Sequence, residues 1–132
     1  MFTLDRFGRT PIYEQLIEQV ERRILDGTLR PRDALPSVRT LSMSLGINPN
    51  TLQKAYTELE RRGVCAGVPG SGRYVTEEAK QLVTGGRRSK MSTLERLVRE
   101  LALAEIPLKE VLACVEEAYQ SAAAAREEEG NP

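Results

Sequence analysis

Two helix-forming stretches of this chain are separated by only three residues, Gly46, Ile47 and Asn48. Apolar residues recur at helical spacing on both sides of the gap: Val38, Leu41 and Leu45 before it, and Leu52, Ala55, Tyr56 and Leu59 after it. So short a connection has the length of the turn in a helix-turn-helix motif. The sequence therefore predicts a helix-turn-helix unit over residues 38–62.

Capping residues mark the ends of both helices. Ser37 is a candidate N-cap of the first helix, and Gly46 suits its C-terminal end. Asn48 is a candidate N-cap of the second helix, and Pro49 after it fits the first helical position. Gly63 supplies the stop, so the second helix is expected to run from 49 to about 62.

A further helix and a hairpin flank this unit. Aliphatic residues recur every four positions upstream, between Pro11 and Gly27: Ile12, Leu16, Val20 and Ile24. Downstream, two β-like runs at 64–68 and 73–76 enclose the turn 69–72, which reads Pro-Gly-Ser-Gly. The predicted fold is mainly α with a small β-hairpin wing, a winged helix-turn-helix domain over residues 1–76.

The remaining residues, 77–132, are predicted to form a linker and a C-terminal helical region. Residues 77–84 look helical, Gly85 and Gly86 are expected to interrupt them, and a basic patch follows at 87–90. Two more helices are expected at 92–105 and from Pro107 onward, and the acidic end of the chain is expected to fray. Their apolar stripes are Leu94, Leu97, Val98 and Leu101, and Leu108, Val111, Leu112, Val115 and Tyr119.

Charge is distributed unevenly along a chain of zero net charge. Residues 1–90 contain 15 Lys and Arg against 10 Asp and Glu, and residues 91–132 contain 4 against 9. The excess of positive charge in the first two-thirds indicates an anionic partner for that part.

Several classes of chemistry find no support in the sequence. The absence of His excludes Ser-His-Asp triads and His-based zinc sites. There is no phosphate-loop motif, and the adjacent carboxylates Glu116 and Glu117 point to different sides of a helix. Cys65 and Cys114 are expected to be buried thiols. The sequence predicts neither an enzyme nor a cofactor or metal site.

The expected location is the cytoplasm. The longest run without charge, 40–53, is rich in Ser, Thr and Asn and cannot span a bilayer. The first ten residues carry Asp5, Arg6 and Arg9 and lack the apolar segment of a signal peptide.

The second helix of the pair carries a polar outward face of Asn50, Thr51, Gln53 and Lys54. Such side chains read base edges in the DNA major groove, and the free N–H groups at the helix start favour a phosphate. A merely solvated helix would explain any one of these residues. Arg39, near the start of the preceding helix, points outward and can contact phosphate or guanine.

The hairpin turn offers a second contact. Gly70 and Gly72 allow a close approach of backbone to a ligand, and Arg73 can reach a phosphate or enter a minor groove. An ordinary surface turn is the alternative when the hairpin is considered alone.

Residues 11–75 closely resemble the N-terminal domain of the GntR family of bacterial transcription regulators. The motifs are L-P-S-x-R-x-L, N-x-N-T-L-x-K-A-Y-x-x-L-E and P-G-S-G-x-x-V, in this order and spacing. The short helical tail resembles the YtrA subfamily. The resemblance implies a sequence-specific DNA-binding regulator, a repressor, and kinship further implies control of its own operon and a neighbouring ABC transporter.

The resemblance also implies roles for individual positions. The DNA-contacting residues of the family fall here on Ser37, Arg39, Asn48, Asn50, Thr51, Gln53, Lys54, Gly70, Ser71, Gly72 and Arg73. Pro49 and Gln53 stand where many members carry Arg, and Arg73 stands where Thr is frequent, so a known operator sequence should not be transferred.

The apolar stripes of the tail predict a homodimer, which would place two recognition helices one turn of DNA apart. The alternative is that the tail packs back onto the winged domain. A winged helix that binds only proteins is the alternative to DNA binding, although such an adaptor would not need the polar face together with Arg39. The sequence indicates no effector.

Overall fold

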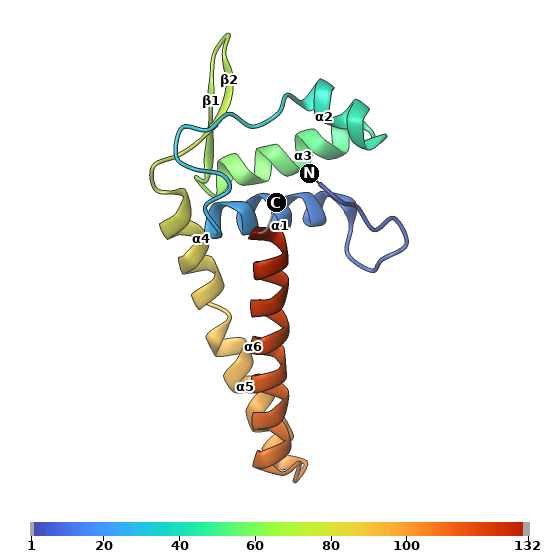
Figure 1. The fold of residues 1–132 in the computed structure, drawn as a ribbon, viewed down its shortest axis with the longest axis vertical. Coiled ribbons are helices and arrows are strands. Elements are labelled where there is room, and N and C mark those ends of the chain that lie inside the picture. The colour runs from blue at the N-terminus through green and yellow to red at the C-terminus, as the bar shows by residue number, and fades with distance from the viewer. Residues whose placement is uncertain (1, 131–132) are drawn as a thin grey trace. The chain divides into compact units, whose positions relative to one another are not determined.

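The computed structural model describes residues 2–130, with side chains through residue 124. Internal contacts divide the chain after Gly85 into two compact units, and the predicted boundary had been placed at 76/77. Figure 1 shows the elements in order: α1 to α3, the strands β1 and β2, and then α4 to α6.

The three predicted helices of the first unit are confirmed. Helix α1 spans Ile12–Leu25, α2 spans Val38–Leu45 and α3 spans Pro49–Arg61. Ser37 Oγ accepts a hydrogen bond of 3.0 Å from Thr40 N at the start of α2, and Gly46 ends that helix with φ +67°. Asn48 Oδ1 accepts a hydrogen bond of 2.8 Å from Asn50 N at the start of α3. The predicted caps therefore define the turn between the two helices.

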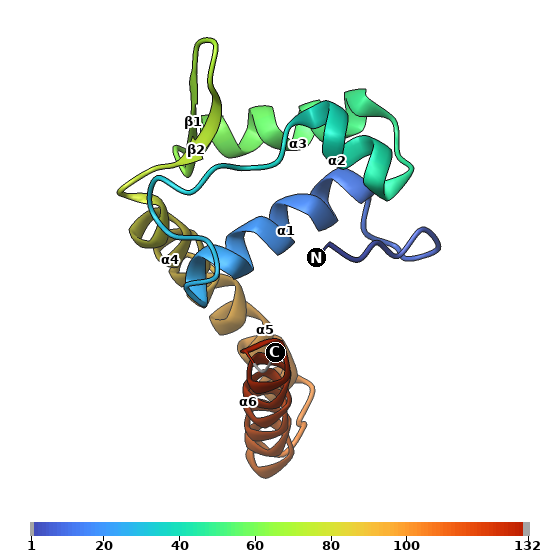
Figure 2. The same ribbon diagram turned by 45° about the horizontal axis from the view of Figure 1, so that its top comes forward.

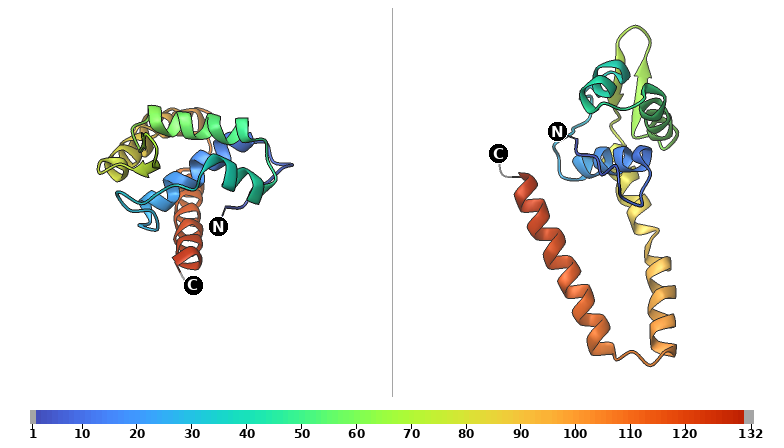
Figure 3. Two further views of the ribbon diagram at one scale, coloured as in Figure 1. Left: turned by 90° about the horizontal axis from the view of Figure 1, so that it is seen from above. Right: turned by 90° about the vertical axis from the view of Figure 1, so that its right-hand side faces the viewer.

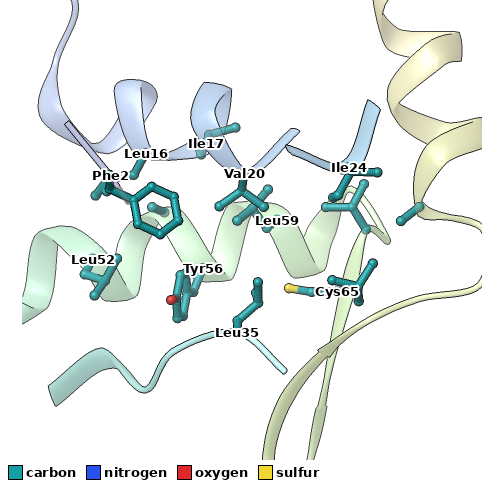
Figure 4. Close-up of a cluster of buried hydrophobic side chains, with 14 of the residues drawn as sticks. Phe2, Leu16, Ile17, Val20, Ile24, Leu35, Leu52, Tyr56, Leu59 and Cys65 are labelled. Carbon is teal, nitrogen blue, oxygen red and sulfur yellow. The ribbon is translucent and has the colours of Figure 1, made fainter. Parts of the chain in front are cut away.

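The core lies mainly between α1 and α3 (Figure 4). Leu16, Val20, Leu52 and Leu59 are almost completely buried, and Tyr56 is buried beside them. Tyr56 satisfies its hydroxyl by donating a 2.7 Å hydrogen bond to Pro36 O, so its ring can pack without leaving a polar atom unpaired. Because this packing fixes one face of α3 against α1, the opposite face is left to solvent.

The segment before α1 is held by side chains rather than by a sheet. Gln19 exchanges two hydrogen bonds with the backbone of Thr3, and Gln15, one turn earlier in α1, does the same with Asp5. Arg6 then donates to Leu45 O at 2.7 Å, at the C-terminal end of α2. The first ten residues therefore help to fix the helix-turn-helix turn, which the sequence did not indicate.

The wing consists of strands β1, Cys65–Val68, and β2, Gly72–Val75, each within one residue of its predicted bounds. They pair antiparallel, with Cys65 opposite Val75. Residues 32–35 lie along the other edge of β2: Leu35 N donates to Arg73 O and Val75 N donates to Asp33 O, both at 2.9 Å. This third segment anchors the base of the wing to the body of the unit.

Helix α4, Ala79–Arg88, corrects one prediction. Gly85 and Gly86 were expected to interrupt the helix, but it continues through both. Glycine lowers helix stability without preventing helical geometry, and the surrounding residues suffice to continue the turn.

The second unit contains α5, Met91–Leu103, and α6, Leu108–Gly130, joined by a short loop. They form an open hairpin whose helices diverge from the loop (Figure 3, right). The backbone is helical as far as Gly130, so the expected fraying does not occur there, since Ala and Glu favour the helix; Asn131 and Pro132 lie outside the described residues. Between residues 86 and 124, no side chain is fully buried.

The thiols of Cys65 and Cys114 differ in burial. Cys65 is buried in the core as expected, and burial raises its pKa to about 11. Cys114 is exposed on α6 within the single chain, contrary to the prediction, because the second unit has no core to receive it. In the described part of the chain, none of the helices is both long enough and apolar enough to cross a lipid bilayer.

Candidate nucleic-acid interface

Helix α3 separates its residues sharply between two faces. Leu52, Ala55, Tyr56 and Leu59 are buried, whereas Asn50, Gln53 and Lys54 are exposed. Thr51 lies between the two faces and is half-buried. The polar face predicted from the sequence is therefore exposed to solvent, although Lys54 also contacts Tyr13 of α1.

The start of α3 is the positive end of a helix. Asn48 and Asn50 are both exposed there, and Pro49 has no N–H to satisfy. Asn48 Oδ1 caps the N–H of Asn50, and Asn48 O accepts from Thr51 N at 3.0 Å and from Leu52 N at 3.4 Å, so the backbone donors of the first turn already have partners. The positive end of the helix dipole still favours an anion such as a phosphate at this point.

Two side chains in the middle of α3 have intramolecular partners. Gln53 Nε2 donates a 3.3 Å hydrogen bond to Thr57 Oγ1, one turn along the helix. Lys54 Nζ lies 3.8 Å from the centre of the Tyr13 ring, which comes from α1. Tyr13 in turn donates to Glu14 Oε1 at 3.2 Å, and this hydrogen bond raises the pKa of its hydroxyl. This cation–π contact joins Lys54 to α1, while the residue as a whole remains exposed.

Helix α2 contributes its first turn. Ser37 is exposed, but its hydroxyl is already used for the cap and for a 2.8 Å hydrogen bond to Thr40 Oγ1. Arg39 is exposed, and among residues 2–130 its guanidinium makes no hydrogen bond or ion pair. Arg39 is thus a cation that remains available to a partner.

The tip of the wing is exposed at Gly70, Ser71 and Gly72. Gly70 has φ +77° and Gly72 has φ +127°, and a Cβ built on either would meet nothing within 4 Å. These glycines are required by backbone conformation rather than by packing. Ser71 hydrogen-bonds with Tyr74 through the two hydroxyls, and Ser71 N donates to Val68 O at 2.9 Å, so the tip is internally braced.

Arg73 differs from its neighbours in the wing. It is only partly exposed, its Nε donates to Glu60 Oε1 at the end of α3, and its Cζ lies 5.3 Å from the centre of the Tyr56 ring. The sequence predicted a side chain free to hold a phosphate, whereas the structure places the guanidinium in an internal ion pair.

The wing and the polar face of α3 lie on the same side of the unit. Figures 1 and 2 show the wing rising beyond α3 on the side away from α1, with α2 alongside α3. A shallow hollow of about 540 Å³ lies beside the wing, lined by Glu60 and residues 67–73. The three elements that carry the candidate residues, α2, α3 and the wing, are therefore neighbours within one unit.

Three residues that shape this surface were missed. Arg6 holds the turn before α3, Tyr13 supports Lys54, and Glu60 pairs with Arg73. Each acts across at least 13 residues of sequence, and no local pattern reveals such a pair.

Comparison with known proteins gives consistent matches. A family model described as "Bacterial regulatory proteins, gntR family" matches residues 12–75. The HTH-type transcriptional repressor YtrA of Bacillus subtilis (strain 168) is 41% identical over 103 residues, which cover 78% of this chain and 77% of that protein.

Solved structures also match this chain. A GntR family transcriptional regulator from Listeria monocytogenes has a TM-score of 0.68 at 30% identity, covering 86% of this chain and 98% of its own. YtrA from Sulfolobus acidocaldarius, a GntR-family transcription factor, has a TM-score of 0.58 at 32% identity, covering 78% of this chain and 97% of its own. Both matches extend beyond the winged unit into the C-terminal helices.

Proposed function

Because the chain belongs to the gntR family of bacterial regulatory proteins, we propose that it represses transcription by binding double-stranded DNA as a homodimer. The observation that carries the proposal is the exposed polar face of α3, in the same unit as the exposed Arg39 and the wing, whose backbone rises on the side of α3 away from α1. A bacterial repressor works on the chromosome, so the proposed location is the cytoplasm.

Each part of the surface has a proposed role. Asn50, Gln53 and Lys54 read base edges in the major groove, with Thr51 at the border of this face. Arg39 supplies a bidentate contact to guanine or phosphate, and the first turn of α3, capped by Asn48, receives a phosphate. Ser37 stands two residues before Arg39 at the start of α2, where its hydroxyl oxygen already caps the helix.

The wing supplies a contact with an adjacent minor groove. Gly70, Ser71 and Gly72 carry little side-chain bulk, and their exposed backbone can approach the floor of a narrow groove closely. The tip is braced by Ser71 and Tyr74, so it would enter without a large loss of conformational entropy.

The second unit supports the homodimer. Its two helices have no buried side chain between residues 86 and 124, yet Leu94, Leu97 and Leu101 are 43%, 45% and 40% exposed along one face of α5. Isolated helices of this length are marginal in water, and an apolar stripe of this kind requires a partner. Val98 completes that stripe, and α6 adds a second one: Leu108, Val111, Leu112, Val115 and Tyr119.

The test is a titration of labelled duplex DNA with the full chain, using fragments selected by the protein from random sequence. With roughly 6–10 phosphate contacts per dimer, log K should fall with log salt by about 0.9 per contact. Arg39→Ala should weaken specific binding by about 1–3 kcal/mol if the contact is bidentate. Arg96→Ala is the control, since it removes an equal charge from an exposed site on α5.

Two results would contradict the proposal. A flat salt dependence would argue against binding to duplex DNA. Failure to enrich any sequence, together with capture of a protein partner through the same face of α3, would favour the adaptor. Repression is tested separately, with a reporter fused to the promoter upstream of the protein's own gene.

A further inference from the structure

The ion pair between Arg73 and Glu60 joins the two elements that are assigned to different grooves of DNA. Arg73 lies on β2, opposite Gly67 in the hairpin, and Glu60 lies in the last turn of α3. Their side chains are 24% and 38% exposed, so the pair is partly shielded from water. Shielding strengthens an ion pair relative to one on the open surface.

Further contacts hold Arg73 in place. Its guanidinium lies over the buried ring of Tyr56, and its backbone oxygen accepts a hydrogen bond from Leu35 N. Tyr56 is itself fixed by the core and by its hydrogen bond to Pro36 O. Arg73 is therefore connected to α3 through its side chain and to the segment 32–35 through its backbone.

We propose that Arg73 is a positioning residue, which sets the angle of the wing relative to α3 through Glu60 and Tyr56, rather than a contact to DNA phosphate. Since the wing tip is braced internally, the wing moves as one body, and its base determines where the tip lies. The distance between the major-groove and minor-groove contacts then depends on this pair. The inference rests on the proposed function.

Local charge supports this assignment. The carboxylate of Glu60 balances the guanidinium of Arg73, so a phosphate at this point would meet no net positive charge from the pair. It would also approach the Glu60 oxygen, which lies 3.9 Å from the position of a Cβ on Gly67 in β1. An anion would gain little here, whereas Arg39 presents an unpaired guanidinium on the same unit.

The experiment exchanges the two charges. DNA binding is measured by anisotropy for the full chain, with a duplex selected from random sequence by the wild-type protein, for R73E, E60R and the double variant. Each single variant should weaken binding by roughly tenfold or more, and the double variant should return to within about threefold of the wild type, since contacting residues couple strongly. Net charge is the same in the double variant and the wild type.

A second measurement separates positioning from contact. Arg73→Ala should leave the slope of log K against log salt unchanged, while hydroxyl-radical protection of the flanking minor groove is lost. Arg32→Ala removes the same charge from an exposed pair with Glu77, at 2.9 Å, and serves as the control. Thermal unfolding of each variant verifies that the unit is folded.

The inference is overturned if the double variant binds as weakly as R73E, or if Arg73→Ala lowers the slope by about 0.9 per protomer, the value for a lost phosphate contact. It is also overturned if Glu60→Gln, which weakens the ion pair, tightens binding. The proposed function fails in a different way, when the wild-type protein itself binds no duplex.

Discussion

The carboxylate of Glu21 is buried in the first unit, where its side chain is 6% exposed and accepts a 3.0 Å hydrogen bond from Arg62. Arg62 also forms an ion pair with Glu58. Arg61, the residue before Arg62, pairs with the same carboxylate. The network connects α1 to the C-terminal end of α3. A buried carboxylate is tolerated only when it is paired, so the pair determines how these two helices are held together.

Removal of Arg62 from its pair with Glu21 should therefore destabilise the first unit. We expect Arg62→Met to lower the free energy of unfolding by about 3 kcal/mol, because it leaves Glu21 buried with less compensation. Adding Glu21→Leu should recover much of this loss, since an apolar pair fits a buried site. Urea unfolding measures both effects.

A matched control exists in the same turn. Arg61 is largely exposed and binds only Glu58 within this network, so Arg61→Met should leave the urea midpoint almost unchanged. Equal losses from the two substitutions would contradict the assignment of the buried pair.

Glu58 gives stability a dependence on pH. Hydrogen bonds from Arg61 and then Arg62 lower its pKa from 4.5 to about 2. The folded state therefore binds its proton less readily than the unfolded state, so the contribution is present above pH 4.5 and is lost as the pH falls toward 2. Glu58→Gln should reduce this part of the acid slope, as measured by urea unfolding at several pH values. An identical slope in the variant would exclude Glu58 as its source.

Among elements, the start of α3 stabilises the fold through its cap and has a proposed role in DNA binding. Asn48→Ala should lower the free energy of unfolding by about 1 kcal/mol, the usual value for a lost N-cap. Asn48→Asp should retain stability, because Asp caps equally well and its charge is favoured at this end of a helix. It should nevertheless weaken DNA binding, since a carboxylate would face a phosphate. Wild-type binding by Asn48→Asp would place the start of α3 away from the DNA backbone.

Helix α4 has two glycines that its packing does not require. A Cβ on Gly85 or Gly86 would meet nothing within 4 Å, and neither has a positive φ. Alanine at each position should therefore stabilise the helix by about 1 kcal/mol, seen as greater helicity by circular dichroism and a higher midpoint. The control is Gly46→Ala, which should destabilise because Gly46 has φ +67°. A loss of stability on changing Gly85 or Gly86 would show that a second chain packs against them.

The elements that could be predicted from sequence are those specified by neighbouring residues. Ser37 and Asn48 are N-cap residues that mark the starts of α2 and α3. The spacing of Leu52, Tyr56 and Leu59 identifies the buried face of α3 and therefore also its exposed face. The pairing of residues 32–35 with β2 could not be predicted, because the flanking prolines, Pro31 and Pro36, favour a loop and the partner strand lies about forty residues away.

The candidate site divides in the same way. The exposure of Asn50, Gln53 and Lys54 follows from the spacing of the buried residues in the same helix, so it could be predicted from the sequence. The state of Arg73 depends on Glu60 and Tyr56, which reach it only in the folded unit, and the sequence therefore predicted a free cation where the structure has a paired one.

At the scale of the whole molecule, the two units differ in whether their apolar side chains are buried or exposed. The first buries its own core and leaves a polar surface, whereas the second exposes apolar stripes and buries nothing between residues 86 and 124. The first can therefore fold around its own contacts, while the second exposes apolar surface that the proposed dimer would remove from water. Assembly and DNA binding are consequently assigned to different parts of the chain, and they can be separated by substitution.

Leu97→Glu should convert the dimer to a monomer in sedimentation experiments at micromolar concentration, because it introduces a charge into the apolar stripe of α5. Leu103→Glu is the matched control. Leu103 is 86% exposed on the opposite side of α5, so this variant should leave the dimer intact.

Affinity of Leu97→Glu for a duplex with two half-sites should fall by about 10²–10⁴, since the second half-site is no longer bound within the same complex. Affinity for a single half-site should be unchanged, because the winged unit retains its core. A monomeric Leu97→Glu with undiminished affinity for the two-site duplex would show that one winged unit suffices, and equal effects of Leu97→Glu and Leu103→Glu would remove the stripe as the dimer interface.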